Sequence, residues 1–129
     1  MTATVVLDAS ALLAAINREP GHENLTTEIL GSAVCSTVNL AEVHTKLVSA
    51  GLDPNEALEV ALTPVREAAD FTVSHAMITG SIIPQTRALG LSLGDRACLA
   101  LAMTLEAPVY TADKAWKSLK LPVRIHVIR

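Results

Sequence analysis

The sequence predicts an α/β protein in which a central, mostly parallel sheet of about four to five strands is covered by helices on both faces. Short β-branched and apolar runs alternate with longer segments whose apolar residues recur at helical spacing. Half of the 129 residues are hydrophobic and 18% are charged, which supplies enough apolar side chains for a core. Because no internal repeat, low-complexity stretch or linker interrupts the pattern, residues 1–129 are expected to form a single domain.

The first half of the chain is expected to contain two strands and four helices. The strands are predicted at residues 5–7 and 34–37, where short buried runs occur. Proline and glycine mark the ends of the helices. Pro20 ends the first helix, Gly51 follows the third, and Asp53-Pro54 suits the start of the fourth. The expected helices cover residues 9–19, about 23–30, 39–50 and 54–63.

The second half repeats the alternation. A third strand is placed within residues 65–73, leading to Phe71, and a helix over residues 74–89 is expected to break near Pro84. Ser92 and Asp95 have the spacing of a capping box, which predicts a helix over residues 95–106. The last strands are expected at residues 109–111 and 124–127. Strands that alternate with helices predict right-handed crossovers and a parallel sheet covered on both faces.

The charges are unevenly distributed along the chain. The formal net charge is −3, from 10 basic and 13 acidic residues, and alone it argues against wrapping nucleic acid by bulk positive charge. All 13 acidic residues precede residue 114, whereas residues 114–129 contain five basic ones. These five are either an ordinary solvated face or, for Lys114 and Lys117, contacts to a nucleic-acid backbone near Asp113.

Other protein classes are disfavoured. The chain has no apolar run near the roughly 20 residues of a membrane helix and begins without a secretory signal, so a cytoplasmic protein with no membrane partner is expected. Cys35 and Cys98 stand in apolar segments, without metal-binding spacing, and are predicted to be buried thiols. His44 should point away from Glu42, because side chains two positions apart on a helix diverge by about 200°; we expect a structural or surface role.

Four carboxylates occupy positions where ligands bind in parallel sheets. Asp8 directly follows the first strand and Asp113 follows residues 109–111, whereas Glu42 and Asp95 stand near the starts of helices that begin beyond strand ends. If the first and fourth strands are neighbours, all four converge on one rim and repel one another unless a cation lies among them. All-oxygen ligation suits Mg²⁺ or Mn²⁺, which support phosphodiester hydrolysis.

Each of these residues also has a structural interpretation. An Asp at a strand end or helix start is commonly a turn or N-cap residue, and Glu42 has the spacing for a surface ion pair with Lys46. Arg96, which follows Asp95, is equally suited to hold an RNA phosphate or to pair with a neighbouring acid.

Four segments together carry a resemblance to a known family. Residues 6–12 (Val-Leu-Asp-Ala-Ser-Ala-Leu), 36–43, 91–100 and 109–113 resemble, in order and spacing, the PIN domain of VapC-type toxin ribonucleases from type II toxin–antitoxin systems. The resemblance implies a three-layer α/β/α PIN-like domain and Mg²⁺- or Mn²⁺-dependent endoribonuclease activity. It assigns Asp8, Glu42, Asp95 and Asp113 to a catalytic and metal-binding quartet, with Ser10 and Thr111 beside it.

The resemblance also implies partners. Such proteins cut RNA, form homodimers and are inhibited by a cognate VapB antitoxin. Two other functions stay open: a catalytically silent PIN-like binding domain that keeps the acids as caps, and a metal-dependent phosphatase acting on small phosphoesters.

Overall fold

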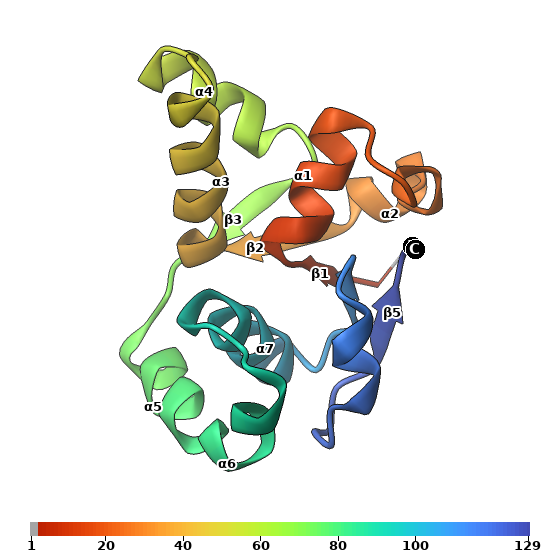
Figure 1. Cartoon of the computed structure of the whole chain (residues 1–129), viewed down its shortest axis with the longest axis vertical. Helices are drawn as coiled ribbons and strands as arrows, with labels where there is room; N and C mark the ends of the chain where they lie inside the picture. The colour runs from red at the N-terminus through yellow and green to blue at the C-terminus, as the bar shows by residue number, and fades with distance from the viewer. Residues whose placement is uncertain (1–2) are drawn as a thin grey trace.

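A parallel five-stranded sheet forms the centre of the computed structural model, which describes residues 3–129 (Figure 1). The strand order is β3-β2-β1-β4-β5, and every neighbouring pair runs parallel. The strands are β1 (Val5–Leu7), β2 (Ala33–Ser36), β3 (Glu67–Ala69), β4 (Val109–Thr111) and β5 (Ile125–Val127). The predicted fold class is confirmed, and the first and fourth strands are neighbours as expected.

Helices cover both faces of the sheet (Figure 1). One face packs against α1 (Ala9–Asn17), α3 (Thr37–Ser49) and α4 (Pro54–Leu62), with the short α2 (Thr27–Gly31) on the same side. The other packs against α7 (Leu93–Leu105), beyond which lie α5 (Val73–Ser81) and α6 (Ile83–Thr86). Three 3₁₀ turns complete the elements: η1 (His22–Asn24), η2 (Arg87–Leu89) and η3 (Lys114–Ser118).

The core consists of two apolar layers separated by the sheet. Side chains alternate along β1, so Val5 and Leu7 pack on the α1 side while Val6 packs on the α7 side. α7 is buried along most of its length because it lies between the sheet and α5. Strands covered on both faces explain why the sequence shows short, wholly apolar runs rather than alternation.

The order of the strands creates a switch point in the sheet. The chain moves outward from β1 to β2 and β3, then returns through α5 and α7 to place β4 on the other side of β1. In open α/β sheets, a crevice forms beyond the carboxyl ends of the two strands at which the winding direction reverses. Here those strands are β1 and β4, which are followed by Asp8 and Asp113.

Two predicted helices are interrupted in the structure. The helix expected over residues 23–30 is wrong in its first half: Asn24 donates its amide to the carbonyl of Ile128 (2.7 Å), and Thr26 caps a new helix by accepting from the backbone of Ile29 (3.2 Å). The break expected near Pro84 within residues 74–89 is confirmed: the first helix ends before Ile82, because Pro84 has no backbone N–H to continue it and instead occupies the first turn of α6.

Other boundaries shift by one or two residues. The capping box is confirmed: Ser92 Oγ accepts from the backbone of Asp95 (3.1 Å), and Asp95 accepts from the backbone of Ser92 (2.9 Å). α3 begins at Thr37 because Ser36 caps it, which places Glu42 in the second turn rather than the first. β3 lies within its predicted range but ends before Phe71, whose backbone donates to Thr37 Oγ1 (3.1 Å).

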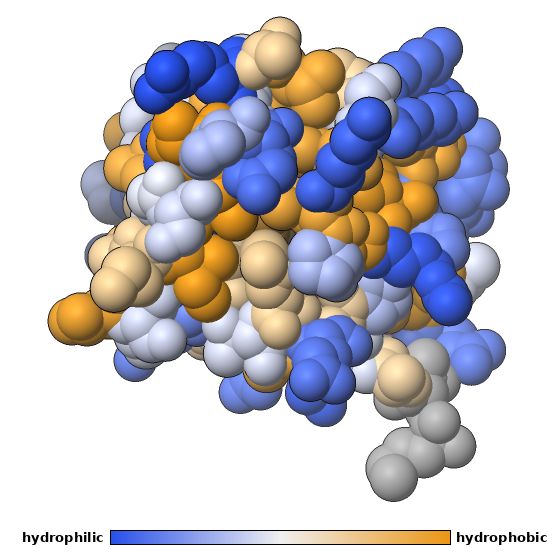
Figure 2. Space-filling model, turned by 90° about the horizontal axis from the view of Figure 1, so that it is seen from below, coloured by the Kyte–Doolittle hydropathy of each residue, from blue (hydrophilic) through white to orange (hydrophobic). Residues whose placement is uncertain are grey.

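The lower face of the molecule combines apolar and hydrophilic surface (Figure 2). On α5, Val73 and Met77 stand one turn apart and are 88% and 73% exposed, the highest values among the large hydrophobic side chains of residues 3–129. No helix within this range is both long and apolar enough to cross a membrane.

Candidate functional site

A pocket of about 350 Å³ lies at the carboxyl edge of the sheet, beyond β1 and β4. All four carboxylates singled out in the sequence line it, although they come from four separate parts of the chain. The lining residues are Asp8, Ala9, Ser10, Leu13, Glu19, Glu42, Lys46, Asp95, Asp113 and Arg129. The structure therefore brings the predicted acids to one place.

Asp8 is the most buried of the four acids, with 3% of its surface exposed. It caps α1: its Oδ1 accepts from the backbone of Ala11 (2.8 Å) and from Ser10 Oγ (2.7 Å), and its Oδ2 accepts from Thr111 Oγ1 (2.6 Å). Burial raises the pKa of Asp8 to about 6, with a small further increase from the charge of Asp95, although all three hydrogen bonds act to lower it. A pKa of about 6 means that the side chain of Asp8 gains its charge about two pH units above an ordinary aspartate.

Ser10 and Thr111 connect Asp8 to the segment that carries Asp113. Ser10 Oγ accepts from the backbone of Ala112 (2.9 Å), and Thr111 Oγ1 accepts from the backbone of Asp113 (3.1 Å). The two hydroxyl oxygens are 3.3 Å apart. These contacts fix the loop after β4 against the start of α1, and they place Ser10 and Thr111 directly beside Asp8.

Glu42 lies against the start of α7. Its Oε1 accepts from Asn39 Nδ2 (2.8 Å), which also donates to the carbonyl of Gly94 (3.0 Å). A Cβ atom added to Gly94 would overlap the Glu42 carboxylate, so a larger residue there would force the Glu42 side chain out of its observed position. The alternative ion pair is not observed: within residues 3–129 no salt bridge joins Glu42 to Lys46, and both side chains line the pocket instead.

Asp95 and Asp113 act as helix caps and line the pocket as well. Asp95 uses Oδ2 in the capping box of α7, and Asp113 caps η3 by accepting from the backbone of Ala115 through Oδ1 (2.9 Å). In the described part of the chain, Asp95 Oδ1 and Asp113 Oδ2 make no hydrogen bond. The structural interpretation of these acids therefore holds, and it leaves one oxygen of each available to a ligand.

The four carboxylates share a pocket without forming a closed ligand set. As the side chains stand, no three His, Cys, Asp or Glu residues within 3–129 are arranged to hold one metal ion. Asp8 is fixed by its hydrogen bonds, whereas Glu42 and Asp95 are only half-buried and Asp113 is exposed. Convergence on one ion would require some of these three side chains to rotate.

The family is decided by the match of the chain to a family model. Residues 5–121 match the model described as PIN domain. The chain belongs to the PIN domain family. The four acids of this PIN domain all lie within the matched region. Arg129, which also lines the pocket, lies beyond its end. No curated protein matches the chain.

Solved structures share the fold of this PIN domain at low sequence identity. A chain of VapBC2 from Rickettsia felis, bound to a DNA fragment from its promoter, is 19% identical with a TM-score of 0.75, over 98% of this chain and 99% of that one. A chain of DNA-bound VapBC from Salmonella typhimurium is 20% identical with a TM-score of 0.73, over 99% and 100%. FitAcB from Neisseria gonorrhoeae contains a chain 18% identical, with a TM-score of 0.63 over 95% and 96%.

Two cationic side chains of the PIN domain also line the pocket, and sequence reasoning missed both in this role. Lys46 stands one turn after Glu42 on α3. Arg129 reaches the pocket because Ile128 is anchored by backbone donation to Thr111 (2.9 Å), and its guanidinium lies 3.6 Å from Glu19 Oε1. Lys114 and Lys117 are exposed on η3 and do not belong to the lining residues.

Arg96 is placed away from the pocket of the PIN domain. Its Nη1 donates to the carbonyl of Thr79 on α5 (2.8 Å), and its Nε is buried without a partner. It forms no salt bridge with a described acid, so of the two alternatives the pairing with a neighbouring carboxylate is not observed. Because adjacent residues on a helix point about 100° apart, Asp95 can face the pocket while Arg96 joins α7 to α5.

The remaining candidates are structural. Cys35 and Cys98 are buried and free, as expected, and burial raises the pKa of Cys35 to about 11 and that of Cys98 well above its ordinary value. His44 lies outside the pocket, with Nε2 3.0 Å from the carbonyl of Pro54, which confirms the structural interpretation.

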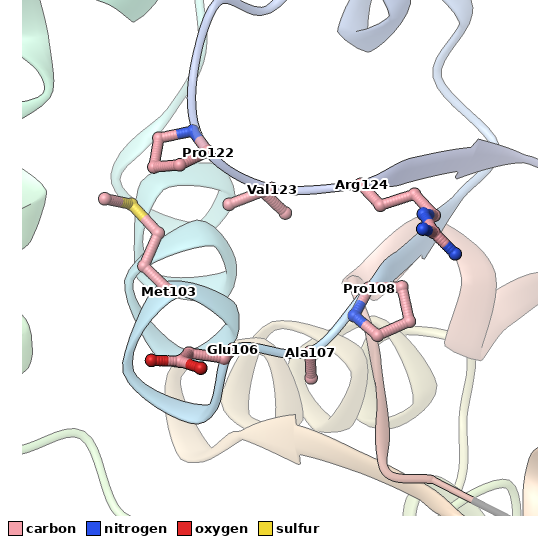
Figure 3. A pocket seen from close by; sticks show the side chains of 7 residues that line it. All are labelled: Met103, Glu106, Ala107, Pro108, Pro122, Val123 and Arg124. Atoms are coloured by element: carbon pink, nitrogen blue, oxygen red, sulfur yellow. The ribbon is translucent and has the colours of Figure 1, made fainter.

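A larger cavity of about 600 Å³ lies at the opposite edge of the sheet, before β4 and β5 (Figure 3). Among residues 3–129, its lining includes none of the four predicted acids, and the charged lining residues are Glu106 and Arg124, which lie on opposite sides of it. The acidic pocket is therefore the candidate site on chemical grounds, although it is smaller.

Proposed function

We propose that this PIN domain is a Mg²⁺- or Mn²⁺-dependent endoribonuclease of the VapC type. The proposal rests on one observation: a single pocket at the switch point of the sheet is lined by Asp8, Glu42, Asp95 and Asp113. Segments separated by as many as 105 residues supply these acids. Structural caps alone have no reason to share one pocket.

The chemistry of the pocket fits a divalent cation. Five carboxylates line it, including Glu19, against the two cations Lys46 and Arg129. Oxygen donors of this kind are the preferred ligands of Mg²⁺ and Mn²⁺, and a bound cation would relieve the repulsion among the carboxylates. Asp8, Glu42, Asp95 and Asp113 would hold the ion, which when bound supplies a more acidic water for attack on phosphorus and stabilises the leaving oxygen.

The residues of the chain itself have separable tasks. Ser10 and Thr111 hold the Asp8 carboxylate in one orientation, so this ligand is preorganised before any cation arrives. Lys46 and Arg129 place positive charge at the same pocket, where RNA phosphates would otherwise meet only acids. A carboxylate with an unused oxygen, such as that of Asp95 or Asp113, is available to accept a proton in the reaction.

The partners follow from the resemblance and from the neighbouring structures. VapBC2 from Rickettsia felis and VapBC from Salmonella typhimurium were solved bound to DNA, and the Klebsiella pneumoniae neighbour is a toxin–antitoxin complex. By analogy, we propose a cognate VapB-like antitoxin, a homodimer and a cytoplasmic location for this chain. Val73 and Met77, exposed together on α5, are the kind of side chains that protein partners cover.

A catalytically silent binding domain is the second candidate, because Asp8, Asp95 and Asp113 all act as caps. The test is to incubate the purified chain with a structured RNA and with p-nitrophenyl phosphate, in Mn²⁺ or in EDTA. A VapC-type nuclease cuts the RNA internally in Mn²⁺ alone and leaves the phosphoester intact. Turnover of the phosphoester alone would indicate a phosphatase, and no turnover of either substrate would indicate the silent domain.

A further inference from the structure

Asn39 is a buried polar residue whose side-chain oxygen has no hydrogen-bond donor. It is 1% exposed on α3, and its Oδ1 has no hydrogen-bond partner. A buried acceptor without a partner destabilises the fold, and leucine, which has a similar volume, would avoid that cost. Packing alone therefore does not explain an amide at this position.

The other end of the Asn39 amide contacts two parts of the pocket wall. Nδ2 donates to Glu42 Oε1 (2.8 Å) and to the carbonyl of Gly94 (3.0 Å). Glu42 is one of the four pocket carboxylates, and Gly94 directly precedes another, Asp95. A single NH₂ group thus connects α3 with the first turn of α7, at the point where each helix presents an acid to the pocket.

Gly94 gives independent evidence that the position of Glu42 is specified. A Cβ atom at Gly94 would overlap the carboxylate of Glu42. Since Gly94 is buried in a helix, where alanine is favoured over glycine by propensity, the absence of a side chain leaves space for that carboxylate. The amide of Asn39 and the gap at Gly94 act on the same group from two sides.

We propose that Asn39 is a positioning residue that holds the Glu42 carboxylate against α7 in the orientation used for metal binding, with Gly94 providing the space. This inference rests on the proposed function. Without the amide, Glu42 is free to rotate toward solvent and must be ordered when the cation binds. Loss of a hydrogen bond that orients a metal ligand typically weakens metal affinity about 10- to 100-fold.

The test is calorimetric titration of the full chain with Mn²⁺, comparing wild type with Asn39→Leu and with Asn55→Leu. Asn55 is exposed on α4 and supplies the matched control, because the chemical change is the same outside the pocket. We expect at least about tenfold weaker Mn²⁺ binding for Asn39→Leu and an unchanged affinity for Asn55→Leu. The melting temperature of metal-free Asn39→Leu verifies that the variant folds, because it loses two hydrogen bonds together with the unpaired buried oxygen.

A purely structural Asn39 predicts an unchanged Mn²⁺ affinity in Asn39→Leu, whatever the melting temperature of the variant. That outcome would overturn the inference. Gly94→Ala provides a second variant, which keeps Asn39 but displaces Glu42, and it should also weaken Mn²⁺ binding about tenfold or more. It keeps the test decisive if Asn39→Leu does not fold.

Mn²⁺ binding distinguishes a wrong positioning role for Asn39 from a wrong metal-dependent function. If the wild-type chain binds Mn²⁺ and both Asn39→Leu and Gly94→Ala bind it equally well, the positioning role is refuted while the metal site stands. If the wild-type chain binds neither Mn²⁺ nor Mg²⁺, the metal-dependent function is refuted and the positioning role with it.

Discussion

The hydroxyl of Thr111 donates a 2.6 Å hydrogen bond to Oδ2 of Asp8, joining residues that are 103 positions apart in the chain. The contact is possible because β1 and β4 are parallel neighbours, with Leu7 paired to Tyr110, so that the residues after both strands meet at one edge. It lowers the pKa of a carboxylate that burial raises to about 6. Thr111 therefore helps to set the pH at which Asp8 becomes a charged ligand.

Replacing Thr111 by valine should raise the pKa of Asp8 further, because valine has nearly the same shape but donates no hydrogen bond to the charged form. The measurement is an NMR titration of the Asp8 carboxyl carbon in the metal-free protein. Thr45→Val, on the exposed side of α3, is the control and should leave the titration unchanged. An Asp8 midpoint that is the same or lower in Thr111→Val would contradict this account.

Asp8 should make the metal-free protein less stable as the pH rises from about 4 to 6. In this range the unfolded chain has released the Asp8 proton, given an ordinary pKa of 3.8, whereas the folded protein still retains it. The free energy of unfolding should fall by up to about 3 kcal/mol across this window, since one pKa unit corresponds to about 1.36 kcal/mol, and then stay level above pH 6.

Urea unfolding of wild type and Asp8→Asn at a series of pH values measures this contribution. The difference in unfolding free energy between the two proteins should change across pH 4–6 in favour of Asp8→Asn, because the amide cannot ionise. Parallel pH profiles for the two proteins would show that Asp8 carries no such shift.

Gly21 should be essential for anchoring the end of the described chain. Its φ of 93° is unfavourable for other residues, and a Cβ atom there would overlap the carbonyl group of Ile128. Gly21→Ala should therefore lower the free energy of unfolding by more than the roughly 1–3 kcal/mol expected from backbone strain alone. Gly51→Ala isolates the strain, because Gly51 has a φ of 110° with open space around it. Equal losses in the two variants would show that contact with Ile128 is unimportant.

Lys46 and Arg129 should contribute to RNA binding rather than to the chemical step. Lys46→Gln and Arg129→Gln should each raise KM for RNA cleavage roughly three- to tenfold with little change in kcat, and each should make KM less dependent on salt. Lys120→Gln, which is exposed and lies outside the lining residues, is the control. A lower kcat with unchanged KM would place the two cations in the chemical step instead.

The parts of the fold that could be predicted depend on local signals. Asp8 and Asp113 were placed at strand ends by the short apolar runs before them, and the Ser92–Asp95 spacing identified the start of α7. The break before Thr26 could not be found in this way. It depends on the bond from Asn24 to Ile128, which lies 104 residues further along the chain.

The site also contains residues with a local sequence signal and residues placed only by distant contacts. The four acids could be proposed from their positions relative to strands and helix starts, whereas the link between Asn39 and Gly94 spans 55 residues and exists only after α3 packs on α7. An Asn three residues before Glu42 in an apolar segment was the one available signal. Arg129 reaches the pocket through the anchoring of Ile128, which no local pattern indicates.

The assignment of the four carboxylates to one metal site is tested by Mn²⁺-dependent cleavage of RNA by purified wild type, Asp8→Asn and Asp95→Asn, with circular dichroism to verify folding. Asparagine preserves a carbonyl oxygen for the caps of α1 and α7 but removes the charge from the pocket. We expect internal cleavage by wild type and a loss of activity of at least about 100-fold in both folded variants, because each lacks an anionic metal ligand. Full activity retained in either folded variant would contradict the assignment of the four carboxylates to one catalytic metal site.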